Sequence, residues 1–323
     1  MLDRLFSNTY TQIAFAIAGI GGLLSDQYGY GYWKVLVVVG VFLLFALFDE
    51  YKRKKVYSAE NIPLPLVINI SNPADSLTAL NALFETLSKK YPDHKKNLKS
   101  YFNIIEKDLI FKYDGDIFDQ ERFVDFLKIT KHQIKKLDAQ TPKNIHFHIV
   151  YIGPIANAIL IGTMFGTEGV TLYQYSKSTD SYTVALDIDS RAYKEHVDTK
   201  EFRIIKKEVI GEISDEATVA IDLASHKVAL AKLEKPIIHL SSKVGATLKK
   251  KEDFIRANQE IYAVINELQQ SVSHIKLLYS MPTTVAILLG MSIQNYWDIE
   301  LTQFGDGEYK SVIKHLNRIK YYF

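Results

Sequence analysis

An internal repeat is the feature that most constrains how this chain folds. Residues 275–304 repeat the pattern of residues 147–175, with proline, alanine and glycine at matching positions. The residues that match 128 positions apart are Tyr151 and Tyr279, Pro154 and Pro282, Ala158 and Ala286, Leu160 and Leu288, and Gly162 and Gly290. After one inserted residue, the matching pairs are Val170 and Ile299, Leu172 and Leu301, Gln174 and Gln303, and Tyr175 and Phe304. Similarity at a fixed period indicates duplication, so the sequence predicts two copies of one folding unit.

Each copy of the repeat predicts a strand, a helix and a second strand. A short apolar run ends before Pro154 or Pro282, and proline suits the first helical position because that position needs no N–H donor. The helix that follows carries alanine and glycine four residues apart, a spacing that lets it pack closely on a sheet. An alternating segment then predicts the second strand. This order of elements builds parallel sheets, so we expect an α/β fold.

The loops that enter the two repeated helices are the expected ligand site. In open parallel sheets, ligands bind beyond the carboxyl ends of the strands, where helix N-termini favour anions. Residues 152–157 and 280–284 occupy that place. The alternative is that proline and glycine mark tight packing alone at these positions.

The first 55 residues differ in kind from the rest of the chain. Residues 5–25 carry no charge, and residues 35–48 are all apolar or glycine. Two such segments predict a transmembrane helical hairpin, with buried core helices as the alternative. Residues 52–55 are all basic, which predicts that the chain after them is cytoplasmic. Three small residues spaced for close helix contact in lipid are Ala14, Ala18 and Gly22.

Further segments extend the two halves. Residues 66–70 predict a strand, with Ser71 and Asn72 introducing a helix over residues 74–90. Residues 209–213 predict the corresponding strand of the second half, followed by Ser214. Residues 236–240 predict another strand, and the Ser241, Ser242 and Lys243 that follow it suit an anion-binding loop or, alternatively, a helix cap.

Composition narrows the chemistry. The chain has 323 residues and no cysteine, which excludes disulfides and thiolate metal sites. Its net charge of +2 is too small for a general electrostatic attraction to DNA or RNA. His146 and His148 share one strand face, yet no third ligand follows at a recognisable spacing. Asp298, Asp306, Glu308 and Lys310 resemble nuclease elements but fall in a surface context. We therefore expect no catalytic residue, no metal site and no cofactor, and expect that the chain is not an enzyme.

The repeat, clearest at residues 275–304, resembles the SAVED domain, a sensor of cyclic oligonucleotides in bacterial CBASS anti-phage defence. The resemblance covers about residues 60–323. It implies two Rossmann-like halves, related to CARF domains, that bind a cyclic nucleotide between them. With the hairpin, it implies three parts: residues 1–55, a transmembrane hairpin; residues 56–195, the first CARF-like half; and residues 196–323, the second.

The resemblance also implies a function. The chain would be a membrane-anchored antiviral effector in the bacterial inner membrane, with its SAVED domain in the cytoplasm. A cyclic di- or oligonucleotide from a partner nucleotidyltransferase would drive homo-oligomerisation and membrane disruption, which causes abortive infection. The alternative is a membrane-tethered enzyme acting on nucleotides.

The expected ligand-binding residues combine the implied position between the halves with the predicted loops and strand ends. They are Ser71, Asn72, Tyr151, Gly153, Asn157, Tyr175, Ser214, Ser241, Lys243, Ser280, Thr283, Thr284 and Phe304. The aromatic members are expected to stack on bases, or else to belong to the core.

Overall fold

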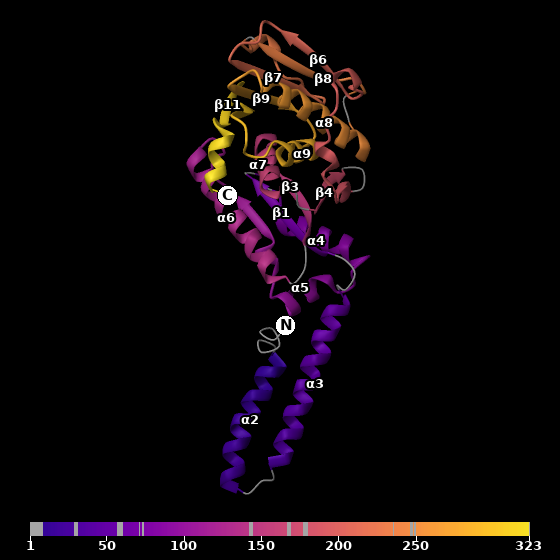
Figure 1. Cartoon of the computed structure of the whole chain (residues 1–323), viewed down its shortest axis with the longest axis vertical. Coiled ribbons are helices and arrows are strands. Elements are labelled where there is room, and N and C mark those ends of the chain that lie inside the picture. The colour runs from indigo at the N-terminus through magenta and orange to yellow at the C-terminus, as the bar shows by residue number, and fades with distance from the viewer. Residues whose placement is uncertain are drawn as a thin grey trace. The chain divides into compact units, whose positions relative to one another are not determined.

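The chain forms two compact units, Met1–Asn61 and Ile62–Phe323 (Figure 1). The computed structural model describes residues 9–28, 32–56, 61–70, 72, 74–141, 145–166, 169–176, 180–234, 236–245, 248 and 250–322.

The first unit is a pair of helices. Helix α2 spans Thr9–Tyr28 and α3 spans Tyr32–Val56. They pack on each other, with the rings of Tyr10 and Phe45 6.1 Å apart and Ala14 buried. Among the described residues, no helix combines the length and the apolar character that a membrane crossing requires.

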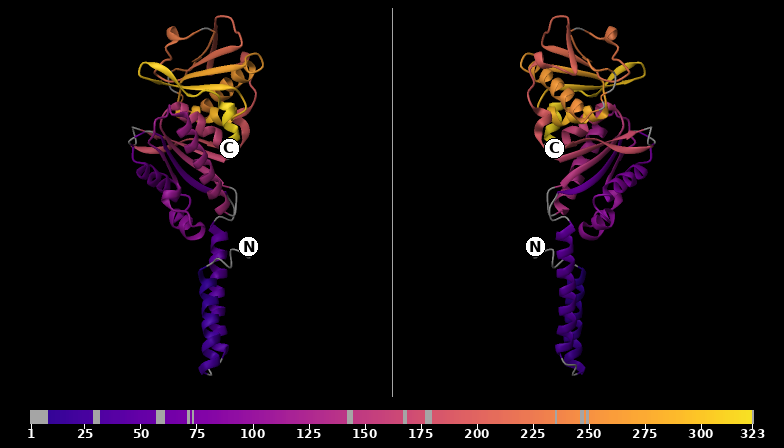
Figure 2. Two further views of the ribbon diagram at one scale, coloured as in Figure 1. Left: turned by 90° about the vertical axis from the view of Figure 1, so that its left-hand side faces the viewer. Right: turned by 90° about the vertical axis from the view of Figure 1, so that its right-hand side faces the viewer.

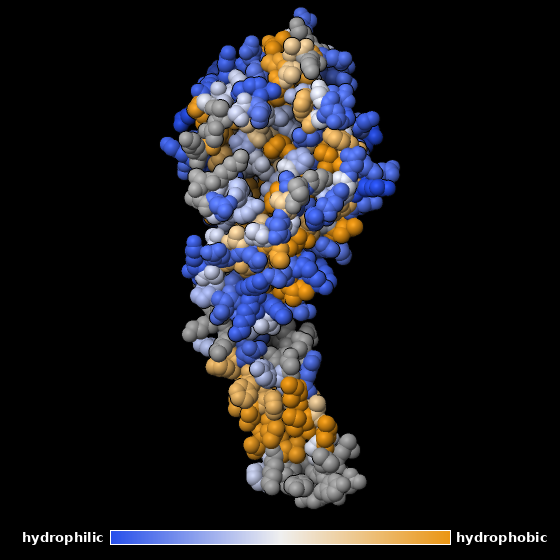
Figure 3. Space-filling view, turned by 180° about the vertical axis from the view of Figure 1, so that it is seen from behind, coloured by the Kyte–Doolittle hydropathy of each residue, from blue (hydrophilic) through white to orange (hydrophobic). Residues whose placement is uncertain are grey.

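Apolar side chains cover much of the surface of these two helices (Figure 3). The exposed large apolar residues include Phe15, Ile20, Trp33, Leu36, Val37, Val41, Leu44, Phe45, Leu47 and Phe48. Soluble monomeric proteins rarely expose a contiguous apolar surface of this kind. Such a surface indicates a contact with lipid or with another protein.

The second unit begins with a sheet in the order β2-β1-β3-β4-β5. Its strands are β1 (Ile62–Ile70), β2 (Ile110–Tyr113), β3 (Ile145–Ile152), β4 (Gly169–Ser176) and β5 (Ser181–Ile188). All pairs are parallel except β4 with β5. The helices of this half are α4 (Ser76–Ser88), α5 (His94–Phe102), α6 (Gln120–Gln140) and α7 (Ile155–Phe165). Every residue of β1 is buried, as expected for a central parallel strand covered on both faces.

A second sheet has the order β11-β10-β9-β7-β8-β6. Its strands are β6 (Ile205–Ile210), β7 (Glu216–Asp222), β8 (Ile237–Ser242), β9 (His274–Ser280), β10 (Ile299–Gly305) and β11 (Glu308–Ile313), and its helices are α8 (Lys251–Leu268) and α9 (Thr283–Ile293). Short 3-10 turns are η1 (Glu106–Asp108), η2 (Arg191–Lys194), η3 (Thr199–Glu201), η4 (Leu230–Lys232) and η5 (Leu316–Tyr322).

The predicted repeat is confirmed as a structural duplication. Strands β3 and β4 flank α7 in the chain, as β9 and β10 flank α9, and each strand pair is parallel. The order β2-β1-β3-β4-β5 matches β8-β7-β9-β10-β11, and β6 is an addition at the edge of the second sheet. The predicted boundary near residue 195 falls between β5 and β6.

One predicted correspondence between the halves is wrong. Of the segment predicted as a strand over residues 209–213, only Val209 and Ile210 are in a strand, as the last two residues of β6, which pairs antiparallel with β8 at the sheet edge. The true counterpart of β1 is β7, which lies next to β9 as β1 lies next to β3. Short apolar runs of this length do not distinguish an edge strand from a central one, whereas burial does: β6 is half exposed and β7 is almost entirely buried.

Helices α7 and α9 pack against each other between the two sheets (Figure 2). A Cβ atom added to Gly162 would lie 2.1 Å from the carbonyl oxygen of Ile287, and one added to Gly290 would lie 1.9 Å from that of Ile159. The repeated glycines therefore serve the contact between the helices, and the prediction that they serve close packing on a sheet is wrong. Both packing partners require a small residue, and spacing alone does not tell them apart.

We predict that Gly162→Ala and Gly290→Ala each destabilise the second unit, because the new methyl group meets a backbone carbonyl that cannot rotate away. Overpacking of this kind costs about 1–3 kcal/mol, and more where backbone must move. Chemical denaturation of the intact chain measures the change. Gly305→Ala is the matched control, since its Cβ would meet only the Phe118 ring at 3.6 Å. Equal stability of all three variants would contradict the assignment.

His94 is buried where α5 meets β1. Its side chain is 1% exposed, its Nε2 lies 2.8 Å from the carbonyl oxygen of Pro63, and its ring packs beside Phe84 and Tyr91. Burial lowers the pKa of His94 to about 4, although the hydrogen bond with the Pro63 carbonyl raises it in part. The folded protein therefore holds this imidazole neutral at pH values where the unfolded chain protonates it.

The sign of this linkage gives a second prediction. The stabilisation by neutral His94 is complete above about pH 6.5 and is lost as the pH falls toward about 4. Relative to His94→Gln, which keeps a polar group near Pro63 but does not titrate, the wild type should lose roughly 3 kcal/mol of unfolding free energy between pH 7 and pH 4. Denaturation curves for both proteins across this range test it, and parallel pH profiles would count against it.

Candidate functional site

A cavity of about 430 Å³ lies at the carboxyl-end edge of the first sheet. Residues from both halves line it: Asn72, Ala74, Tyr151, Ile152, Gly153, Leu172, Tyr173, Gln174, Tyr175, Tyr182, Thr283, Thr284 and Ile287. The first ten come from the loop after β1, the end of β3 and the residue after it, residues 172–175 of β4 and the start of β5, and the last three come from α9. The volume falls within the range of small-molecule sites.

The N-terminus of α9 reaches this cavity from the second half. Pro282 occupies the N-cap position of α9. Its side chain has no hydrogen-bond acceptor, so it makes no capping hydrogen bond to the first N–H groups of the helix. The first N–H groups of a helix lack intrahelical partners and carry partial positive charge. This end of the cavity is therefore suited to an anion, and two threonine hydroxyls stand beside it.

Aromatic rings make up much of the remaining lining of the cavity. Four tyrosines contribute them: Tyr151, Tyr173, Tyr175 and Tyr182. The rings of Tyr175 and Tyr182 meet edge-on at 5.5 Å, since the antiparallel register of β4 and β5 places these residues opposite each other. Tyr175 is 47% exposed and its hydroxyl donates to Asp180, so its ring is available to a ligand.

The polar groups behind the tyrosines are neutral. Tyr173 shares a hydrogen bond of 3.0 Å with His148. Burial raises the pKa of Tyr173 to about 12 and lowers the pKa of His148 to about 3. Among the described lining residues there is no charged side chain, so the partial positive charge of the α9 N-terminus is the feature of this lining that suits an anion.

Several predicted site residues line this cavity together: Asn72, Tyr151, Gly153, Tyr175, Thr283 and Thr284. Gly153 has a φ of +152°, and a Cβ there would lie 2.8 Å from the Tyr151 hydroxyl oxygen and 3.0 Å from the Ile70 carbonyl oxygen. Asn72 accepts from the N–H of Ala74, while Asp75 caps α4. The helix cap predicted at Ser71 or Asn72 therefore lies further along the chain, and Asn72 is left at the cavity.

Other predicted residues lie elsewhere. Ser71 is outside the described residues. Asn157 is fully buried in α7, and its side-chain amide has no hydrogen-bond partner among the described residues. The Ser280 carbonyl accepts from the N–H groups of Leu223 and Ala224. Ser214 precedes β7 and so lies at the amino end of that strand, opposite the expected edge.

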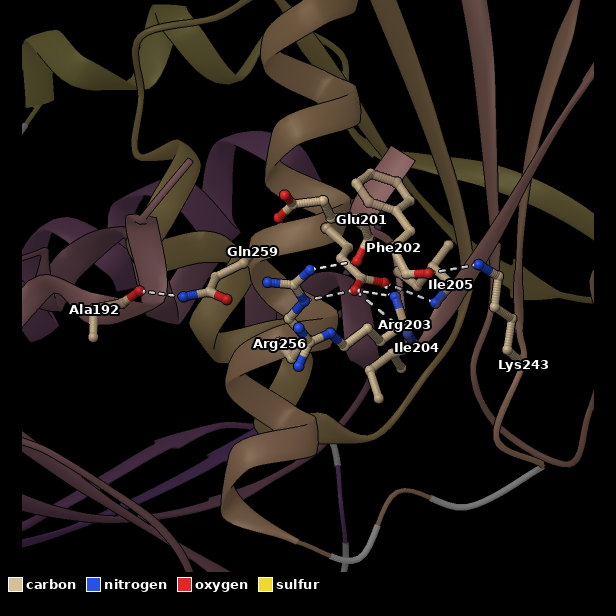
Figure 4. A network of polar contacts seen from close by, with 10 residues as sticks. Ala192, Glu201, Phe202, Arg203, Ile204, Ile205, Lys243, Arg256 and Gln259 are labelled. Carbon is tan, nitrogen blue, oxygen red and sulfur yellow. Dashed lines mark hydrogen bonds and ion pairs between the residues drawn. The ribbon is translucent and has the colours of Figure 1, made fainter. Parts of the chain in front are cut away.

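The predicted anion loop after β8 has a structural role. Lys243 Nζ donates to the carbonyl of Phe202 at 2.6 Å (Figure 4), while Ser241, at the end of β8, pairs with Lys206 of β6. Next to it, buried Glu260 of α8 accepts from the backbone N–H groups of Arg203, Ile204 and Ile205 and from Arg256 Nε. The Glu260 contacts fix the start of β6 on α8. The Lys243 ammonium, which was expected to meet phosphate, is hydrogen-bonded to the Phe202 carbonyl instead.

Phe304 also lies apart from the first cavity. It is 52% exposed, its ring lies 5.1 Å from that of Tyr309, and both line a second cavity of about 440 Å³ on the second sheet. At the corresponding end of α7, the N–H of Ala156 is 3.4 Å from Gln303 Oε1. The two copies of the repeat therefore present different surfaces at equivalent places.

Sequence reasoning missed Tyr173, Gln174 and Tyr182 as lining residues. The alternation of aromatic and polar residues in β4 was a usable signal, because Tyr173 and Tyr175 lie on the same strand two residues apart. Tyr182 could not be found in this way, since its place depends on the pairing of β5 with β4.

A family model described as "SAVED: SMODS-associated and fused to various effectors sensor domain" matches residues 189–314. This segment is similar to the SAVED sensor domain. The SAVED-like segment holds β6 to β11 with α8 and α9, which is less than half of the chain and all but the end of its second half. No match to the chain is found among curated proteins.

Solved structures similar to the chain include a Cap4 SAVED/CARF-domain containing receptor from Acinetobacter baumannii, at 14% identity and a TM-score of 0.49, covering 86% of this chain and 54% of the receptor. Two more structures of that receptor, one with the cyclic trinucleotide 2'3'3'-cAAA and one with 3'3'3'-cAAA, each have 15% identity and a TM-score of 0.48, covering 85% and 55%. The chain thus spans about half of the length of the receptor that it matches.

Proposed function

We propose that this chain is a receptor for a cyclic di- or oligonucleotide made by a partner nucleotidyltransferase, and that the ligand binds in the cavity at the edge of the first sheet. The observation that carries the proposal is the meeting of a helix N-terminus from one half with a tyrosine-lined sheet edge from the other. The SAVED match over residues 189–314 supports a sensor, and the ligand class follows the resemblance found in the repeat.

The chemistry of the cavity fits such a ligand. Each base has a π-face that stacks on aromatic side chains, at about 1–3 kcal/mol per base. A phosphodiester is an anion, and helix N-termini bind anions with their free N–H groups. Asn72 and Gln174 add amide donors and acceptors that can read base edges.

The lining favours binding over turnover. Among the described lining residues there is no carboxylate, histidine or lysine to act as a general base, and the Tyr151 hydroxyl is engaged with the Pro154 carbonyl at 2.6 Å. We therefore propose a receptor rather than an enzyme that acts on nucleotides.

We further propose that residues 1–55 anchor the chain in the bacterial inner membrane, with the rest in the cytoplasm. The exposed apolar side chains of α2 and α3 support a cover of lipid, and the basic residues 52–55 support the cytoplasmic side. Ligand binding would drive self-association of hairpins and disruption of the bilayer. Moving a two-state switch from 1:99 to 99:1 takes about 5.5 kcal/mol, which a ligand held by both halves can supply.

Ligand binding is tested with two variants at equivalent positions of the repeat. Tyr175→Ala should weaken binding of a cyclic trinucleotide about 5- to 150-fold, because one stacking surface is lost. Phe304→Ala, which removes the matching aromatic from the second cavity, should leave affinity unchanged. Calorimetry on the purified chain measures both. The reverse ranking would place the ligand on the second sheet, and breakdown of the nucleotide during incubation would favour the enzyme.

Membrane anchoring is tested separately. Removal of residues 1–55 should keep ligand affinity and abolish ligand-dependent dye release from liposomes, since only the hairpin meets lipid. Because the native chain has no cysteine, single cysteines at Gly29 and Ser58 can be labelled selectively in intact cells. An impermeant reagent should label position 29 and spare position 58. Toxicity that persists without the hairpin would place the activity in the remainder of the chain.

A further inference from the structure

Two histidines and a carboxylate meet at the amino-end edge of the second sheet. His274 begins β9, Asp298 directly precedes β10, and His315 follows β11. The Nδ1 atoms of His315 and His274 lie 2.9 Å and 3.4 Å from the same oxygen, Asp298 Oδ1. The two imidazole rings are 5.6 Å apart. The ligand atoms of all three residues lie within 4.8 Å of one another.

A fourth group adds a second carboxylate. Glu300 Oε2 lies 3.6 Å from Nε2 of His274, so both ring nitrogens of His274 face a carboxylate oxygen. A neutral imidazole carries a single N–H and satisfies only one of them as a donor. A single N–H on His274 therefore leaves one of its two carboxylate contacts without a donor, and a cation between His274 Nδ1 and Asp298 Oδ1 would fill that place.

The spacing suits a tetrahedral ion. Zinc bonds of about 2.0–2.1 Å to nitrogen and oxygen place neighbouring ligand atoms roughly 3.3 Å apart. The distances from Asp298 Oδ1 to the two Nδ1 atoms, 2.9 Å and 3.4 Å, bracket this value. Small rotations of the side chains would suffice to accept the ion.

Charge and exposure fit the same role. Asp298 and Glu300 bring two negative charges, and Lys276 offsets part of one at 3.8 Å from Glu300. The side chains are partly buried, from 18% exposed at Glu300 to 33% at His315, so an ion could enter without rearrangement of the fold. Two imidazoles with carboxylates prefer zinc or a similar transition ion to magnesium or calcium.

We propose that His274, Asp298 and His315 bind one zinc-class divalent cation, and that Glu300, which faces the other ring nitrogen of His274, orients that imidazole. The ion would join the starts of β9 and β10 to the segment that leads from β11 into η5. It would lie at the end of β9 opposite Ser280, and so away from the proposed nucleotide cavity. The sequence did not reveal this site because its ligands are 24 and 17 positions apart and come from three elements.

A second cluster serves as an internal comparison. His146 faces Asp187 at 3.2 Å and Asp189 at 3.3 Å, but it contributes the only imidazole and the Asp189 side chain is 76% exposed. His146 and His148, the pair that the sequence placed on one strand face, are engaged with Thr171 and Tyr173. One imidazole and exposed carboxylates make a weaker zinc site than the His274 cluster.

The experiment uses the intact chain, purified without a polyhistidine tag, treated with chelator and titrated with Zn²⁺ and with Co²⁺. We expect one ion per chain, visible absorption bands of tetrahedral Co²⁺, and a higher thermal midpoint with Zn²⁺. His315→Gln retains a polar group for Asp298 but is a poor ligand. It should weaken Zn²⁺ binding by at least the 10- to 100-fold that even an outer-shell change costs.

Matched variants decide the outcome. His146→Gln and His226→Gln, the latter at an exposed position, should leave Zn²⁺ affinity and the Co²⁺ spectrum unchanged. Should His315→Gln fail to fold, His274→Gln and Asp298→Asn carry the same expectation. The proposal is overturned if the wild type binds no Zn²⁺ at micromolar concentration, if binding follows His146, or if it survives in all three ligand variants.

Discussion

The backbone contact between Gly162 and Gly290 is the constraint on which the second unit depends. At this point α7 and α9 approach so closely that a methyl group on either glycine would overlap a carbonyl of the other helix. Because each helix is also a crossover between strands of its own sheet, their contact sets where the two sheets lie. The same contact points the N-terminus of α9 toward the edge of the first sheet. The cavity shared by the two halves is thus a consequence of helix packing at two small residues.

Polar burial completes this arrangement without placing charge in the site. Glu260 is fully buried yet receives three backbone N–H groups and a guanidinium, so its carboxylate is satisfied where β6 begins. His94 and His148 are held neutral by burial on the first half. The cavity itself is lined by hydroxyl, amide and aromatic groups, and its positive character is limited to the N–H groups at the start of α9. These groups are the ones that the proposed ligand, with its flat bases and phosphates, would need.

The repeat could be read from the sequence because fixed spacing survives divergence, and it correctly predicted the strand, helix and strand of each half. It also placed Tyr151, Tyr175, Thr283 and Thr284 near one another, since strand ends and helix starts in parallel sheets share an edge. The positions of Ser214 and Lys243 could not be predicted in this way. The place of Ser214 depends on which of two short apolar segments is the central strand. The contact of Lys243 is with the Phe202 carbonyl, which only the folded chain brings near. The His274 cluster needs three elements in register, and no local pattern encodes that.

The two copies of the repeat differ at the N-termini of their helices. At the first sheet edge, the α9 N-terminus faces an open cavity beside Gln174, whereas at the second edge the α7 N-terminus is met by the side chain of Gln303, the residue that repeats Gln174. At the start of α7 the protein's own amide, that of Gln303, accepts from the N–H of Ala156. Pseudo-symmetry is therefore kept in the scaffold and broken at the surface. Under the proposed receptor function, this asymmetry would give each chain one nucleotide site rather than two, although its scaffold is duplicated.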